Sequence, residues 1–213
     1  INFHDYLSFR SSVQVGKLKA DDSLSKHKNI QSRNLSFESN ILDVNIGFEF
    51  NFQRFMIRKR RIVYSPYVFA GLAFFSFNPT AENSYGQIVE LQNLGTEGQD
   101  SPANNKNKYN LNSIAIPFGI GYKANIGEKL ALGIEWVWRA TQTDYIDDVS
   151  GYYVNSSYLS DESAEMSNPS EINVIEGKTR GNPNNNDWYN FTGLTISYKI
   201  KNKPKKCPKE LLP

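Results

Sequence analysis

The sequence predicts an all-β protein: a transmembrane, antiparallel, up-and-down outer-membrane β-barrel, six strands of which are visible in this chain. Three observations predict this fold. Apolar residues recur at every second position over segments of about ten residues, as in barrel strands. The segments between them alternate between long and short. Aromatic residues gather toward both ends of the apolar faces, where membrane interfaces favour them.

Composition is compatible with this fold. The 213 residues suit one domain, and the mean hydropathy of -0.54 taken alone describes a polar protein. No stretch approaches the roughly 18 to 20 apolar residues that a membrane helix needs. Barrel strands escape that test because their lipid-facing and lumen-facing residues alternate. A net charge of +2 is too small to indicate a nucleic-acid binder.

The clearest strand covers residues 130–140. One face is apolar and continuous, with Leu130, Leu132, Ile134, Trp136, Trp138 and Ala140. The opposite face carries glycine and charge, with Ala131, Gly133, Glu135, Val137 and Arg139. A strand places two such sets on opposite sides of a sheet.

Four further segments alternate in the same way. Residues 42–52 set Leu42, Val44, Ile46, Phe48, Phe50 and Phe52 against Asp43, Asn45, Gly47, Glu49 and Asn51. Residues 114–125 set Ile114, Ile116, Phe118, Ile120, Tyr122 and Ala124 against Ala115, Pro117, Gly119, Gly121, Lys123 and Asn125. Shorter alternations cover residues 7–15 and 193–200. Each predicts one strand.

A sixth strand, over residues 63–77, is apolar on both faces, so its orientation stays open. Pro66 lacks a backbone donor, which fits the beginning of a strand.

The connections alternate in length. Long polar segments cover residues 19–34, 78–108 and 143–187, and short ones cover 54–62 and 125–129. Long loops at the outer end and short turns at the periplasmic end are typical of outer-membrane barrels. A soluble lipocalin-like barrel is the alternative, with its apolar face turned inward. Its convex surface should be richer in Lys and Glu than the polar face found here, so the membrane barrel is favoured.

Six strands leave two edges unpaired, whereas bacterial barrels have an even number of strands and at least eight. We therefore expect residues 1–200 to form a barrel that lacks one N-terminal hairpin, with eight strands in the full protein. A different closure, with fewer strands or an added partner strand, is the less favoured alternative. Residues 201–213 are expected to form a basic periplasmic tail.

The polar faces carry charges that we expect to line the lumen: Arg10, Glu49, Lys123, Glu135 and Arg139. An eight-stranded barrel is just wide enough for side chains to fill it, so these residues predict a charge network rather than a channel. Glu49 and Glu135 should lie near Arg10, Lys123 or Arg139, and a Glu135→Leu substitution should leave Arg139 unpaired.

Catalytic and metal-binding motifs are weak. The two histidines, His4 and His27, lie in no hydrolase-type motif, so the sequence predicts neither an enzyme nor a cofactor. Asp144, Asp147 and Asp148 could supply oxygen ligands for Ca²⁺, but they lack the spacing of an EF-hand loop. A solvated acidic loop is the favoured interpretation.

Two basic segments fall on the predicted periplasmic side and suggest docking of an acidic partner. The first is a short turn with Arg58, Lys59, Arg60 and Arg61, and the second is the tail with Lys203, Lys205, Lys206 and Cys207. Cys207 is the single cysteine, so it is either a free thiol or a partner in an intermolecular disulfide.

Several stretches, in order along nearly the whole chain, resemble the PorG-like barrel proteins of Bacteroidota. They are RNLSF (33–37), FEFNF (48–52), SPYVFAGLAFFSFNP (65–79), LGTEGQ (94–99), IPFGIGYK (116–123), TDYIDDVS (143–150) and RGNPNNNDWY (180–189).

The resemblance implies an integral outer-membrane component of the type IX secretion system, without known catalytic residues. It also implies association with the periplasmic ring of PorK and PorN, named GldK and GldN in gliding bacteria. Members of the family carry a further stretch of strand before the region that begins here. The alternative function is a small passive porin-like or adhesin-type barrel that binds through its long outer loops.

Overall fold

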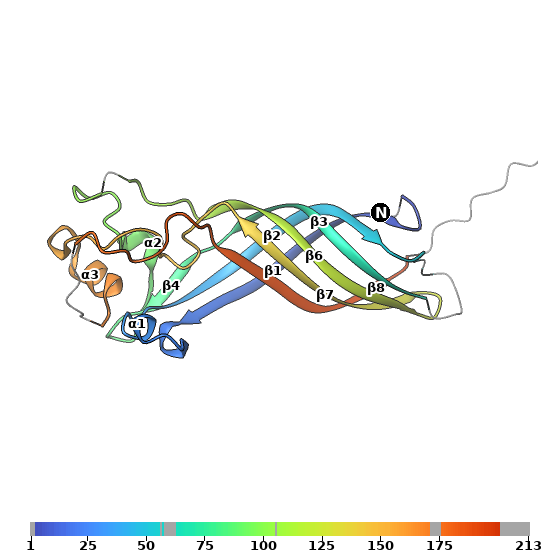
Figure 1. Cartoon of the computed structure of the whole chain (residues 1–213), viewed down its shortest axis with the longest axis horizontal. Coiled ribbons are helices and arrows are strands. Elements are labelled where there is room, and N and C mark those ends of the chain that lie inside the picture. Colours follow the sequence, from blue (N-terminus) through green and yellow to red (C-terminus); the bar gives the residue numbers. More distant parts are fainter. Residues whose placement is uncertain (1–2, 56, 58–62, 105, 171–175, 201–213) are drawn as a thin grey trace, which may run out of the picture.

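The computed structural model describes residues 3–55, 57, 63–104, 106–170 and 176–200. Each long strand pairs antiparallel with its neighbours along the chain, in an up-and-down order that curls into a half-barrel (Figure 1). The six long strands are β1 (Leu7–Asp21), β2 (Ser36–Asn51), β3 (Tyr64–Ser76), β6 (Asn112–Ile126), β7 (Leu130–Thr141) and β8 (Trp188–Tyr198). The predicted all-β, antiparallel up-and-down architecture is confirmed.

Two short strands belong to the same sheet and were not predicted. β4 (Pro79–Glu82) pairs with the beginning of β2, and β5 (Ile88–Glu90) pairs with β4 in a hairpin. Both lie in the segment 78–108, which the sequence analysis treats as a loop. Segments of three or four residues carry too little alternation to be recognised, and β4 forms because β2 begins six residues before its apolar alternation does.

Beyond the apolar alternation, the β1–β2 ladder is polar. β1 continues to Asp21 and β2 begins at Ser36, so residues 19–21 are strand rather than loop. The ammonium groups of Lys17 and Lys19 lie 2.7 and 2.6 Å from the carboxylate oxygens of Glu38 across this ladder. The hairpin therefore extends past the apolar part of the sheet.

The helices gather at the end of the sheet that carries the long connections, at the left of Figure 1. They are all short: η1 (Asp22–Leu24), α1 (Lys28–Gln31), α2 (Leu91–Leu94), η2 (Ser156–Tyr158) and α3 (Asp161–Ser167). None of the helices in the described part of the chain has the length and apolar character needed to cross a membrane.

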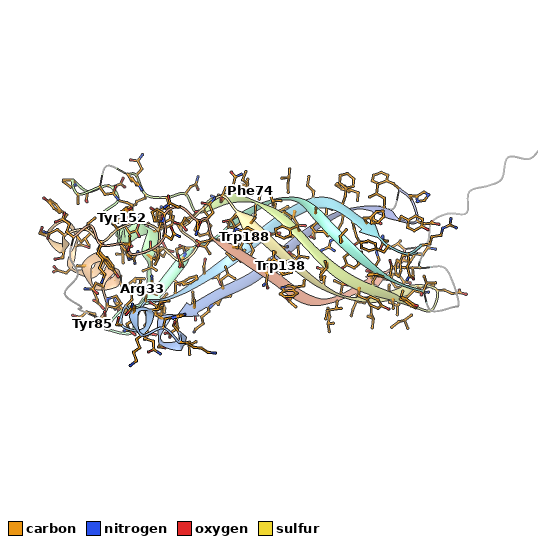
Figure 2. The ribbon with its side chains drawn as sticks, viewed as in Figure 1. Arg33, Phe74, Tyr85, Trp138, Tyr152 and Trp188 are labelled. Atoms are coloured by element: carbon orange, nitrogen blue, oxygen red, sulfur yellow. The ribbon has the colours of Figure 1, made fainter. Side chains whose placement is uncertain are left out.

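The outward faces of the long strands are apolar and exposed. Trp138 and Phe74 lie on this part of the molecule, whereas Arg33, Tyr85 and Tyr152 lie at the loop end (Figure 2). The outward residues are about half exposed, among them Ile46, Phe48, Phe118, Ile134 and Trp136. A soluble lipocalin-like barrel would turn its apolar faces inward, whereas these strands turn theirs outward.

The orientation of β3 is settled by packing. Tyr67, Phe69 and Phe75 point inward and are buried, whereas Leu72 and Phe74 point outward and are exposed. β3 is apolar on both faces because one face packs in the interior and the other belongs to the apolar outer surface.

Inward-facing glycines permit the tight curl. A Cβ atom at Gly71 would lie 2.1 Å from the carbonyl oxygen of Ile46, and one at Gly119 would lie 2.3 Å from that of Trp136. Neighbouring strands approach too closely at these points for any side chain.

The sheet remains open between β1 and β8. Among the described residues, β1 pairs only with β2, and β8 pairs only with β7. Near this open side, a Cβ atom added at Gly193 of β8 would meet nothing within 4 Å. The structure is therefore a half-barrel with two free edges.

Candidate functional site

Glu135 on β7 is the centre of a group of interacting side chains inside the half-barrel, toward its short-turn end. Its carboxylate accepts two hydrogen bonds from Arg10 of β1, with Nη1–Oε2 and Nη2–Oε1 distances of 2.7 and 3.0 Å. The hydroxyl of Tyr67 donates a third, at 3.0 Å. The Arg10 guanidinium also lies 4.6 Å from the ring centre of Phe69. Three strands, β1, β3 and β7, thus contribute to one interior pair, although β1 and β7 are not neighbours in the sheet.

Glu49 on β2 forms the second interior pair. Its carboxylate accepts a hydrogen bond from Lys123 of β6 and lies 3.7 Å from the guanidinium of Arg10. The Lys123 ammonium lies 4.5 Å from the ring centre of Phe55 and 5.1 Å from that of Tyr67. Both carboxylates are less than a tenth exposed.

Arg139 lies apart from these pairs, nearer the loop end of β7. It is 1% exposed, and its Nε lies 3.3 Å from the carboxylate of Asp43 on β2. Its guanidinium also donates to the Val137 carbonyl at 2.9 Å and to the side-chain carbonyl of Gln14. The hydroxyl of Tyr189 on β8 donates to the same carboxylate of Asp43 at 3.1 Å.

These contacts correct one expectation. Arg139 pairs with Asp43 rather than with Glu49 or Glu135, so a Glu135→Leu substitution would strip Arg10 of its partner and leave Arg139 paired. Arg139 follows Glu135 by four residues on the same strand, a distance of roughly 13 Å along the strand. Asp43 could have been identified, because it lies on the polar face of the alternating segment 42–52.

The interior thus balances its charges. Three cations, Arg10, Lys123 and Arg139, meet three carboxylates, Asp43, Glu49 and Glu135. Toward the loop end lies a cluster of buried apolar and aromatic residues: Ile41, Ala73, Phe75, Phe77, Ala115, Ile146 and Tyr189. Burying charges is costly unless they are paired and hydrogen-bonded, and pairing meets that requirement here. The arrangement fills the interior with side chains.

A second ion cluster lies at the loop end, around Glu97. This side chain is 2% exposed and accepts hydrogen bonds from the backbone amides of Ser150 and Gly151, both at 2.9 Å. Nη1 of Arg180 lies 3.3 Å from Glu97, and Nη2 lies 3.5 Å from Asp148. One arginine thereby joins two long connections that are distant in sequence.

Asp148 is the other buried carboxylate of this cluster. It accepts hydrogen bonds from the hydroxyls of Tyr109, at 2.7 Å, and Thr96. Burial raises its pKa. Glu97 and Arg180 were not identified as site residues, and only their occurrence in the quoted stretches LGTEGQ and RGNPNNNDWY could have drawn attention to them.

Two further aspartates at the loop end have raised pKa values. Burial raises the pKa of Asp147 to about 6. Burial, and then the negative charge of Asp147, raise the pKa of Asp187 to about 7, although the amide of Ile146 donates to its carboxylate at 2.9 Å. The loop end therefore contains carboxyl groups that titrate near neutral pH.

The acidic stretch is not the solvated loop favoured from the sequence, because Asp148 is buried. Asp148 is engaged with Arg180, Tyr109 and Thr96. Within the ranges that the structure describes, no group of three His, Cys, Asp or Glu side chains is placed to hold a metal ion.

The predicted docking residues lie outside the part of the chain that the structure describes. They are Arg58, Lys59, Arg60 and Arg61 of the short segment and Lys203, Lys205, Lys206 and Cys207 of the tail. At the short-turn end of the sheet, His4 stacks on Tyr6 with ring centres 5.6 Å apart. His27 lies at the other end, immediately before α1, and is exposed.

A family model described as "Domain of unknown function (DUF6089)" matches residues 2–209. No curated protein and no solved structure matches the chain.

Proposed function

The chain belongs to the DUF6089 family, whose description assigns no activity, and we propose that it is a structural and assembly component of the type IX secretion machinery. In this proposal it is an integral outer-membrane barrel that anchors the periplasmic ring of PorK and PorN, named GldK and GldN in gliding bacteria.

The observation that carries the membrane location is the reversal of polarity. The long strands expose Ile, Leu, Val, Phe and Trp on their outer face and pair charged groups on their inner face. Soluble monomers rarely expose large contiguous apolar patches. Lipid would cover the outer face, and backbone hydrogen bonds satisfy the polar groups of β2, β3, β6 and β7, each of which is paired on both sides.

The paired interior favours an anchor over a channel. The three cations and three carboxylates are each paired with protein groups, and apolar and aromatic side chains fill the interior between them and the loop end. A water-filled lumen would leave such charges solvated, as in the wider barrels of porins. The protein therefore holds a position in the membrane while its ends contact other components.

The choice of partner is supported by the resemblance of seven stretches to PorG-like proteins and by the basic turn at residues 58–61. A dense positive charge at the short-turn end would attract an acidic protein surface. The tail, with Lys203, Lys205, Lys206 and Cys207, would lie on the same side.

An adhesin-type barrel is the second proposal, because the loop end exposes apolar side chains. Tyr85 is 84% exposed and Ile88 is 68% exposed on the β4–β5 hairpin. In this case the partner would bind to the loop end rather than to the short-turn end.

Gentle extraction from native membranes followed by affinity purification tests both proposals. We expect the protein in the outer-membrane fraction, together with the ring proteins. Replacing Arg58, Lys59, Arg60 and Arg61 by Ser should reduce the co-purified ring, whereas replacing Lys106 and Lys108 at the loop end by Ser should not. Recovery in a soluble fraction would refute the barrel proposal, and loss of a partner only in the loop-end variant would favour the adhesin.

A further inference from the structure

A partly enclosed cavity of about 190 Å³ lies at the loop end, where four distant parts of the chain meet. The end of β1, the beginning of β2, the β4 strand and the connection after β7 all contribute to its wall. Its polar lining includes Asp21, Glu82, Asp147, Arg33 and Arg180. The cavity is separate from the paired interior of the half-barrel.

Both arginines of the lining are already neutralised. Nε and Nη2 of Arg33 lie 2.7 and 2.9 Å from the carboxylate oxygens of Asp22. Arg180 is paired with Glu97 and Asp148. Nη1 of Arg33 also donates to the carbonyl of Arg180 at 2.9 Å, which joins the first long connection to the last.

The remaining carboxylates leave an excess of negative charge. Among the described residues, no ion pair within 4 Å involves Asp21, Glu82 or Asp147. The Asp147 carboxylate accepts one hydrogen bond, from the Val149 amide at 3.0 Å. A positively charged group in the cavity would supply the missing counter-charge.

One wall of the cavity is apolar. Leu91 and Met166 belong to a small buried cluster with Ala81, and Phe37 packs against it. A wall of this kind would contact the methylene groups of a long cationic side chain, whose stem is apolar and whose head is charged.

A hydrogen-bond donor in the lining also lacks an acceptor. Nε of Arg180 is buried without a partner among the described residues, and the residue is 4% exposed. An unsatisfied buried donor is costly. A ligand that carries a carbonyl oxygen beside its cation would satisfy it.

We propose that this cavity binds a peptide segment through an arginine or lysine side chain. The cation would lie among Asp147, Asp21 and Glu82, its stem along Phe37, Leu91 and Met166, and a peptide carbonyl would accept from Arg180. The proposal does not depend on the membrane location or on the ring partner.

The electrostatics predict a dependence on pH. Asp147 faces Arg33, Arg180, Asp148 and Asp187, and the wall also carries Asp21, Asp22 and Glu82. Burial raises its pKa to about 6, so Asp147 gains its negative charge as the pH rises from 5 to 7. Affinity for a cation should rise over the same interval.

Calorimetric titration of the full chain in detergent tests the proposal with three probes. N-acetyl-arginine amide carries the cation and the carbonyls, N-acetyl-citrulline amide has the same shape without the charge, and n-butylguanidine has the same single charge and a similar stem without the carbonyls. We expect the arginine probe to bind about tenfold more tightly than either control, the effect of one charge-assisted contact. Equal binding of the citrulline probe, or no binding of the arginine probe, would overturn the proposal. Equal binding of n-butylguanidine would overturn the role of the carbonyl.

An Asp147→Asn variant should weaken the arginine probe about tenfold. Glu176→Gln, an exposed residue outside the lining, is the matched control and should change nothing. If Asp147→Asn does not fold, binding of the arginine probe to the unmodified chain is compared at pH 5 and pH 7.5. Binding that is as tight at pH 5 as at pH 7.5 would contradict a charge at Asp147.

Discussion

Arg10 and Glu135 form a two-point ion pair across the interior, with nitrogen–oxygen distances of 2.7 and 3.0 Å, although 125 positions separate them in sequence. Their strands, β1 and β7, do not pair with each other. The contact therefore spans the concave side of the half-barrel and limits how far the sheet can open. The bond from Tyr189 on β8 to Asp43 on β2 does the same nearer the loop end.

A Glu135→Leu substitution should destabilise the protein by about 3 kcal/mol, because it leaves the Arg10 guanidinium largely buried without its main partner. Glu49, at 3.7 Å, offers only a longer contact. The midpoint of thermal unfolding in detergent measures the effect. Glu38→Gln is the control, since Glu38 pairs with lysines on the exposed ladder and such pairs contribute little to stability. Equal effects of the two changes would show that Arg10 is solvated.

Gly71→Val should prevent the sheet from curling, because its Cβ would lie 2.1 Å from the Ile46 carbonyl oxygen, which belongs to the backbone and cannot yield locally. Overpacking of this kind costs on the order of 3 kcal/mol or more. The folded fraction on an unheated electrophoresis gel measures it. Gly193→Ala is the matched control, since nothing lies within 4 Å of the added atom. Normal folding of Gly71→Val would mean that the strands can separate there.

The free edges of β1 and β8 should exchange their amide hydrogens faster than β6, which is paired on both sides. We expect a difference of at least about tenfold in this chain, measured by mass spectrometry. In a barrel closed by two further strands, both edges should become protected. Equal protection of β8 and β6 in this chain would indicate that another partner already covers the edge.

The loop end should lose stability as the pH rises. The pKa of Asp187 is raised from 3.8 to about 7 in the folded chain. The folded state therefore retains a proton that the unfolded state releases, and the stabilisation is complete below pH 3.8 and lost as the pH rises through about 7. Urea unfolding at pH 5 and pH 8 measures it. Asp187→Asn should lose less stability over this interval than the unmodified chain, and an equal loss would assign the effect to another group.

The proposed membrane location can be tested with the outward tryptophans. Trp136, in the middle of β7, is 45% exposed, and Trp188 begins β8 near the loop end. Single-tryptophan variants in vesicles of lipids brominated near the bilayer centre should show stronger quenching of Trp136 than of Trp188. Absence of quenching at Trp136 would place this surface outside the bilayer.

Alternation alone determined most of the fold. In residues 42–52, 114–125 and 130–140, a period of two places the apolar set on one face and the charged set on the other. The strands, their order and the outward direction of Ile46, Phe118 and Trp136 follow from this local pattern. The same reasoning placed Glu49 and Glu135 on the inner face, where the structure has them.

Tertiary structure decided whatever depends on contacts between distant segments. Residues 63–77 are apolar on both faces, and Tyr67 turns inward because Gly121 on the paired strand leaves room for its ring. Arg139 pairs with Asp43 because both lie at the same level of the half-barrel, nearer the loop end than Glu135. β4 pairs with β2 because β2 extends beyond its apolar alternation. Glu97 and Arg180 meet only after two long connections have folded together. Neither segment has a periodic pattern from which this contact could be predicted.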